Sequence, residues 1–190
     1  MAGYHRIRSS TVRNYMLQDR TGAEDERGGP MDVSIEPARE EDLQGILEVM
    51  RTANMHYVPS PEMPDLDWRC YFVARVNGKI AGASGYRILS STEAKTTLMA
   101  VLPEFRCFGI GRALQERRMM VLYELGIKTL TTNADIPQTI EWYKKHYGYL
   151  QIGKVKKVHE FGRADIDEWT RLQTDLTTWV KSHAKRTEQP

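Results

Sequence analysis

A glycine-spaced turn between a strand-like run and a helix-like run constrains the fold of this chain more than any other feature. The turn reads Arg-Cys-Phe-Gly-Ile-Gly over residues 106–111, after the run Thr96 to Val101 and before the run Arg112 to Leu125. Glycines let backbone N–H groups approach a ligand closely, and a helix N-terminus adds a positive dipole. The sequence therefore predicts an anion-binding turn. Its glycine spacing differs from those of the Walker loop and the Rossmann fingerprint.

Length and composition predict one domain with a hydrophobic core, because 41% of the 190 residues are hydrophobic. The formal net charge is only +2, from 27 basic and 25 acidic residues, so we expect no nucleic-acid partner. Two cysteines and five histidines, without an H-x-x-x-H pair, predict no metal site. No apolar run approaches the roughly 18–20 residues of a membrane span, and the N-terminus has no hydrophobic signal core. We therefore expect a cytoplasmic protein without a membrane partner.

The chain divides into three predicted parts: a flexible N-terminal extension over residues 1–31, a folded domain over 32–184 and a tail over 185–190. Within the domain, periodicity predicts strands that alternate with helices, and Asn77-Gly78 predicts a hairpin turn. This order is typical of a mixed α/β or α+β sheet. The predicted strands are 33–38, 70–76, 79–89, 95–102, 127–134 and 149–158, and the predicted helices are 40–53, 112–125 and 138–147.

Two further segments are distinctive. The segment from Met55 to Asp67 contains three prolines and three acidic residues, which predicts a stiff acidic loop. Near the C-terminus, apolar residues from Ile166 to Val180 recur at helical spacing, which favours a helix. The part from Trp169 to Asp175 fits a strand as well, so periodicity leaves both structures open there.

A second motif follows the glycine turn, where residues 134–149 read Ala-Asp-Ile-Pro-Gln-Thr-Ile-Glu-Trp-Tyr-Lys-Lys-His-Tyr-Gly-Tyr. Together the two motifs resemble the GNAT N-acetyltransferase superfamily, which pairs an R/Q-x-x-G-x-G/A loop with a later x-P-x-x-I-x-x-Y-x-x-x-G-F helix. Tyr147 is inserted relative to that pattern, and Tyr149 stands in the usual Phe place. The resemblance covers about residues 33–180 and implies the GNAT fold. That fold is a mixed, mostly antiparallel sheet of about six to seven strands, splayed between the fourth and fifth strands and flanked by about four helices.

The resemblance implies acetyl-CoA as acyl donor. Backbone N–H groups of the turn would hold its pyrophosphate, and Arg106 and Arg112 would add positive charge. Pantetheine would pair with the main chain of the preceding strand like an added strand. The family often has Asn at the place of Ile136, and Asn133 would supply that contact here. The implied cofactor-binding residues are Met99, Ala100, Val101, Arg106, Cys107, Phe108, Gly109, Ile110, Gly111, Arg112 and Asn133.

The implied reaction is direct attack of a primary amine on the thioester through a tetrahedral intermediate. Tyr143 matches the family's general-acid tyrosine, because a phenol with a pKa of about 10 can protonate a thiolate whose pKa is about 8.5. A backbone N–H near Val101 would stabilise the oxyanion. The general base stays open among His56, Glu93, Asp135 and His159.

The acidic loop occupies the place where the family builds its acceptor wall. Its carboxylates, Glu62 among them, would receive a cationic small-molecule or peptide amine, although the loop also reads as a solvated cover. The implied acceptor-binding residues are His56, Tyr57, Asp65, Asp67 and Trp68. The family's register makes residues 168–176 a strand, followed by a short helix over 177–184. The family often dimerises through its C-terminal strands, so the resemblance is also compatible with a homodimer.

Two other functions stay open. A sensor would bind acyl-CoA without turnover, although Tyr143 argues against it. A transferase for a longer acyl-CoA or an acyl carrier protein would need a basic surface, for which the segment from Lys154 to Lys157 is the candidate.

Overall fold

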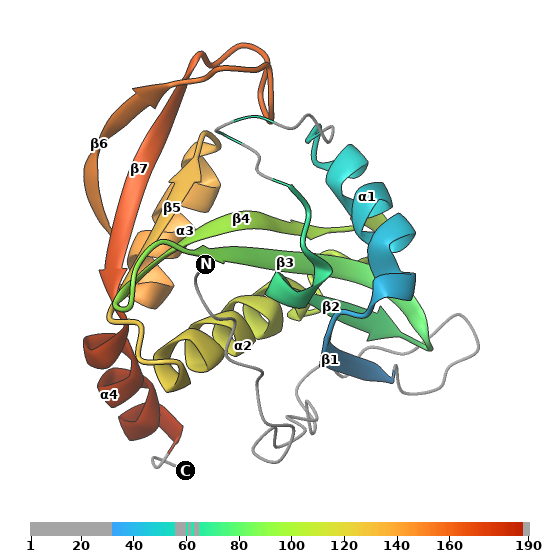
Figure 1. Cartoon of the computed structure of the whole chain (residues 1–190), viewed down its shortest axis with the longest axis horizontal. Coiled ribbons are helices and arrows are strands. Elements are labelled where there is room, and N and C mark those ends of the chain that lie inside the picture. Colours follow the sequence, from blue (N-terminus) through green and yellow to red (C-terminus); the bar gives the residue numbers. More distant parts are fainter. Residues whose placement is uncertain (1–31, 56–59, 61, 63–64, 188–190) are drawn as a thin grey trace.

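The computed structural model describes residues 32–55, 60, 62 and 65–187. The predicted N-terminal extension, His56, Tyr57 and the last three residues lie outside the described residues. The described chain forms one sheet with the strand order β1-β2-β3-β4-β5-β7-β6 and four α-helices (Figure 1). The strands are β1 Val33–Pro37, β2 Tyr71–Val76, β3 Lys79–Ile88, β4 Glu93–Val101, β5 Thr129–Ala134, β6 Leu150–Lys156 and β7 Glu168–Asp175, and the helices are α1 Leu43–Thr52, α2 Ile110–Glu124, α3 Pro137–Tyr147 and α4 Leu176–Thr187.

The sheet is antiparallel except between β4 and β5, and this parallel pair is short. Only residues 93–95 of β4 pair with residues 129–131 of β5, so the two strands separate from Thr96 onward. The hydroxyls of Thr96 and Thr132 lie 2.5 Å apart and bridge the strands where the ladder ends. The predicted mixed sheet and its splay between the fourth and fifth strands are both confirmed.

A bulge in β4 lies just beyond this point. Leu98 is paired with Gly85 of β3, and Thr96 is paired with Tyr86, so Thr97 is the extra residue. The bulge is supported from beneath by Arg118 of α2, whose side chain is fully buried. Its guanidinium donates hydrogen bonds to the carbonyls of Gly85 and Leu98 at 3.0 and 2.7 Å. A bulge bends its strand, and this one turns the second half of β4 away from β5.

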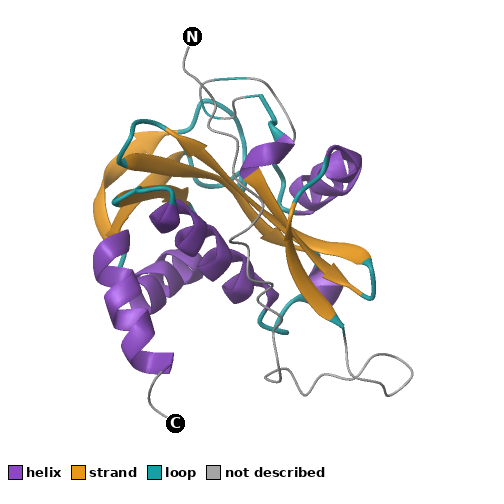
Figure 2. Ribbon diagram, turned by 60° about the horizontal axis from the view of Figure 1, so that its bottom comes forward, coloured by secondary structure: helices purple, strands orange, loops and turns teal. Residues whose placement is uncertain are grey.

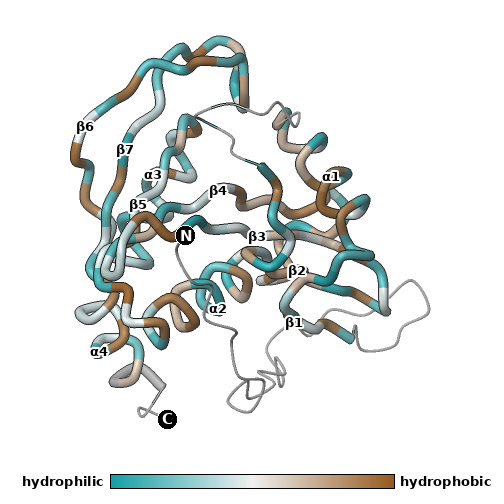
Figure 3. Tube along the Cα trace, viewed as in Figure 1, coloured by the Kyte–Doolittle hydropathy of each residue, from teal (hydrophilic) through white to brown (hydrophobic). Residues whose placement is uncertain are grey.

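Helices cover both faces of the sheet, as Figure 2 shows. On one face, α1 packs Ile46 and Val49 against Val73 and Leu98. On the other face, α2, α3 and α4 build the larger core. Hydrophobic and hydrophilic residues alternate around α1, as expected for a helix with one buried face (Figure 3). None of the described helices is long and apolar enough to span a membrane.

The ambiguous C-terminal segment is a strand followed by a helix, as the family register implied. β7 has neighbours on both sides and buries both of its faces: Trp169 joins the core under α1, while Leu172 joins the core under α2. Apolar residues three apart on opposite faces of a strand imitate helical spacing. The helix that periodicity favoured there is therefore wrong over Glu168–Asp175, and α4 begins only at Leu176.

Candidate active site

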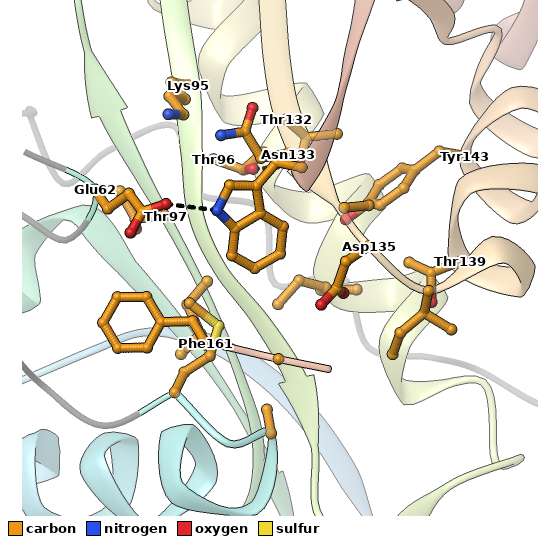
Figure 4. Close-up of a pocket in the computed structure, with 18 residues that line it drawn as sticks. Glu62, Lys95, Thr96, Thr97, Thr132, Asn133, Asp135, Thr139, Tyr143 and Phe161 are labelled. Carbon is orange, nitrogen blue, oxygen red and sulfur yellow. Dashed lines mark hydrogen bonds between the residues drawn. The ribbon is translucent and has the colours of Figure 1, made fainter. Parts of the chain in front are cut away.

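A cavity of about 170 Å³ opens where β4 and β5 separate (Figure 4). The two strands supply its walls, the start of α3 closes one side, and the segment after β6 closes the other. Its lining is mostly apolar, with hydroxyl and amide groups from the strands. The lining residues are Ala53, Met55, Glu62, Lys95, Thr96, Thr97, Leu98, Met99, Thr132, Asn133, Ala134, Asp135, Ile136, Thr139, Tyr143, Phe161, Gly162 and Trp169.

Tyr143 lines this cavity from α3. The helix begins at Pro137 and ends at Gly148, which takes the left-handed conformation with φ of 65°. Between these two residues, Tyr143 is only 3% exposed, and its ring lies 5.0 Å from that of Tyr149. Its hydroxyl end points toward the cavity and, within the described part of the chain, makes no hydrogen bond (Figure 4). A buried phenol with a free hydroxyl can donate a proton to a group placed in the cavity.

The glycine turn joins the end of β4 to α2. Gly109 precedes the first helical residue with φ of 76°, and no side chain caps the N-terminal N–H groups of the helix. Cys107 is exposed and also has a positive φ, of 69°. The Arg106 side chain turns back and donates a hydrogen bond to the Val101 carbonyl at 3.2 Å. The turn therefore presents uncapped N–H groups, as an anion site requires.

The second half of β4 has one open edge. Met99, Ala100 and Val101 are paired with β3 on one side, and no described strand pairs with them on the other. Main-chain N–H and C=O groups on an unpaired edge can receive an extended ligand as an additional strand. Asn133 faces the same cavity from β5.

Glu62 ties the acidic loop to the opposite wall of the cavity. Its carboxylate accepts hydrogen bonds from the Trp169 indole N–H at 2.6 Å and from the His159 backbone N–H at 3.0 Å. Asn54, at the end of α1, donates to the carbonyl of Gly162 at 2.8 Å. The segment between β6 and β7 is therefore held against the segment that follows α1.

Asp135, a candidate base, lies in a buried ion pair. Its carboxylate is 2.8 Å from the Lys157 ammonium, and both side chains are almost fully buried. The same oxygen accepts the Arg163 backbone N–H at 2.7 Å. Lys157 also donates to the carbonyls of Phe161 and Arg163 and lies 4.5 Å from the Trp169 ring centroid. This geometry favours a structural role for Asp135.

Of the other candidate bases and acceptor residues, those that the structure describes are not among the residues that line the cavity. Glu93 is exposed at the start of β4, and the His159 ring contacts the Phe161 ring in a tilted arrangement with centroids 5.2 Å apart. Asp67 caps the single-turn helix η2 (Trp68–Cys70) by accepting the Arg69 N–H, and Arg69 covers the Trp68 ring. Asp65 is exposed. Their contacts with an acceptor stay predictions.

The structure adds residues to the cavity that the motifs did not indicate. Lys95, Thr97, Phe161 and Trp169 all line it, whereas only Glu62 of the loop carboxylates does. The alternation of residues along β4 could have predicted that Lys95 and Thr97 share one face. It could not have predicted that this face borders a cavity, because the cavity forms only where β4 and β5 separate. Within the described ranges, no three His, Cys, Asp or Glu side chains gather closely enough to hold a metal ion.

Comparisons with known proteins agree with this architecture. The family model for an acetyltransferase (GNAT) domain matches residues 67–149. An uncharacterized N-acetyltransferase of Chlorobaculum tepidum is 31% identical over 117 residues, which cover 60% of this chain and 71% of that protein. The chain belongs to the GNAT acetyltransferase family.

Solved structures show the same fold at lower identity. Ard1 from Thermoplasma volcanium superposes with a TM-score of 0.62 at 21% identity, over 75% of this chain and 97% of that chain. The putative acetyltransferase yncA from Salmonella typhimurium, solved with acetyl-CoA, gives a TM-score of 0.58 at 18% identity, over 76% of this chain and 94% of that one. The predicted family and fold are therefore confirmed.

Proposed function

We propose that this protein transfers an acetyl group from acetyl-CoA to a primary amine by direct attack of the amine on the thioester. The observation that carries the proposal is the position of Tyr143. Its free hydroxyl end faces a cavity that also borders the unpaired edge of β4. The acetyl-CoA in the related Salmonella structure supports the choice of donor.

Main-chain and side-chain groups of this chain suit different parts of acetyl-CoA. The uncapped N–H groups of residues 107–112 suit a pyrophosphate, with Arg106 and Arg112 beside them. The open edge of β4 at Met99, Ala100 and Val101 suits the amides of pantetheine, and Asn133 faces them across the splay. A bound thioester would then lie in the cavity near Tyr143.

The reaction balances with groups of this chain and water. The neutral amine attacks the thioester carbonyl, and an N–H of the open β4 edge stabilises the oxyanion that forms. As the C–S bond breaks, Tyr143 gives its proton to the departing sulfur. The phenolate regains a proton from solvent or from the acetylated amine. Because Asp135 is held in a buried ion pair, we propose that water takes the first proton of the amine.

The replacement of Tyr143 by Phe tests this role, because it removes the hydroxyl and leaves the ring. We expect Tyr143→Phe to lose at least about tenfold in kcat, the lower range for acid catalysis, with an unchanged acetyl-CoA Kd. Liquid chromatography of released CoA and calorimetry measure the two quantities. Tyr123→Phe, at a partly exposed tyrosine of α2, is the matched control.

Two results would contradict the proposal. An unchanged kcat in Tyr143→Phe would remove the general-acid role. Tight acetyl-CoA binding without transfer to any amine would indicate the sensor instead of a transferase.

A further inference from the structure

Three cationic side chains share the face of the sheet onto which the cavity opens. Lys95 lines the cavity from β4 (Figure 4). Arg87 of β3 is the direct cross-strand partner of Lys95, and Arg171 of β7 is the partner of Asn133, which also lines the cavity. Cross-strand partners project from the same face of a sheet. The three cations therefore lie on β3, β4 and β7, on the face of the sheet that borders the cavity.

None of these three cations takes part in an ion pair within the described chain. Like charges at directly opposite positions destabilise a sheet, and Lys95 faces Arg87 in this way. Burial lowers the pKa of Lys95. The charges of Arg87 and Arg171 lower this pKa further, and the charge of Glu62 raises it. The buried Lys157, in contrast, has Asp135 as its partner. Among the residues that the structure describes, the positive charge beside the cavity thus has no ion-pair partner.

Within the described residues, the carboxylates of the cavity form no ion pair with these cations, although the charge of Glu62 acts on Lys95. Glu62 is engaged by the Trp169 and His159 N–H groups, and Asp135 by Lys157 and the Arg163 N–H. Lys95 and Tyr143 lie on different sides of the lining in Figure 4. A ligand that spans them would place its reacting amine toward Tyr143 and a negative group toward Lys95.

We propose that the acceptor is a free amino acid, whose carboxylate is bound by Lys95 and Arg171 while its amine meets the thioester. This proposal rests on the proposed transferase function and specifies its acceptor. A guanidinium can bind a carboxylate through two parallel hydrogen bonds, and an ammonium adds a compact charge. Arg87 reinforces the positive field from β3. A peptide N-terminus would present an uncharged amide at that place and would leave the cations unpaired.

Matched acceptors test the proposal. The twenty amino acids and their C-terminal amides are each offered to the full chain with acetyl-CoA, and released CoA is measured by chromatography. The amine of an amide is less basic than that of the acid, so intrinsic reactivity favours the amide. We expect at least one acid to exceed its amide about tenfold or more in kcat/KM, the effect of a charged hydrogen bond. Equal or better use of every amide would overturn the proposal, as would transfer to no acid.

Two variants locate the effect. We expect Lys95→Met and Arg171→Gln each to lower the acid-to-amide ratio of kcat/KM about tenfold or more. Arg171 is exposed, so its replacement is informative even if Lys95→Met fails to fold. Lys154→Gln on β6, where Lys154 pairs with Glu168, is the control and keeps the ratio. An unchanged ratio in both test variants would overturn the assignment. Acetyl-CoA binding, measured by calorimetry, separates this failure from failure of the proposed function.

Discussion

Lys95 carries a stability cost that follows from its place beside the cavity. Burial, Arg87 and Arg171 all disfavour its charged form, so its pKa in the folded chain lies below the ordinary value of 10.5. Below both pKa values the side chain is charged in the folded and the unfolded chain alike, and the folded state bears the whole penalty. As pH rises between the two pKa values, only the unfolded chain keeps the proton, and stability increases. Residues at binding sites often carry such costs.

We therefore expect Lys95→Met to be more stable than the wild type at pH 7. The difference should shrink as pH rises and should vanish above pH 10.5, where Lys95 is neutral in both states. Urea unfolding of the two proteins across this range measures it. Lys154→Gln, which removes an exposed lysine of β6, is the control and should show no such trend. A lower stability of Lys95→Met at pH 7 would mean that the ammonium has a favourable partner.

The glycine turn contains two glycines that serve the fold differently. Gly109 has φ of 76°, a conformation that costs other residues about 1–2 kcal/mol. Gly111 has an ordinary helical backbone, and a Cβ there would make normal contacts with Met99 and Val101 at 3.7 and 3.8 Å. Only the first glycine is therefore required by backbone geometry, which agrees with the G/A choice in the family motif.

We expect Gly109→Ala to lose about 1–2 kcal/mol of unfolding free energy and Gly111→Ala to gain up to about 1 kcal/mol. Denaturant unfolding without ligand measures both, and each variant serves as the control of the other. Equal destabilisation by both changes would show that the space around Gly111 is tighter than these contacts indicate.

The elements themselves were largely predictable from the sequence. Local periodicity, Asn77-Gly78 and Gly148 act within a few residues, so they predicted most strands and helices to within a few positions. β7 was the exception, because burial of both its faces imitates helical spacing. The bulge at Thr97 was not predictable, since it depends on Arg118, 21 positions later, which donates to the Leu98 carbonyl.

The parts of the candidate site also differed in how far local sequence signals could predict them. Tyr143 could be placed because Pro137 and Gly148 fix its helix, and it lines the cavity, while its role as general acid stays a proposal. The side of the cavity that the acidic loop reaches could not be predicted, because tertiary contacts decide which acidic residue lines the cavity. Glu62 reaches it through Trp169, whereas Asp67 turns to cap its own helix.

At the scale of the whole molecule, the cavity exists because segments far apart in the chain are held together. Asp135 follows β5 and Lys157 follows β6. Their ion pair holds the segment between β6 and β7 against the place where β4 and β5 separate. Gly162 lies so close to Asp135 that a Cβ there would overlap the carboxylate. Asn54 and Glu62 hold the other side of the same segment. The wall of the cavity that the segment between β6 and β7 forms therefore depends on this buried pair.

Removal of one partner from a buried ion pair leaves an uncompensated charge and costs about 3–5 kcal/mol. We expect Asp135→Asn and Lys157→Met each to fall in this range. The double variant should lose less than the sum of the two by at least about 1 kcal/mol, because the second change removes the stranded group. Denaturant unfolding of the four proteins completes the cycle. Lys154→Gln, at the exposed Lys154–Glu168 pair, should cost less than about 1 kcal/mol. Additive losses would show that Asp135 and Lys157 stabilise the fold independently, and that their ion pair is not what holds the segment between β6 and β7 against the splay.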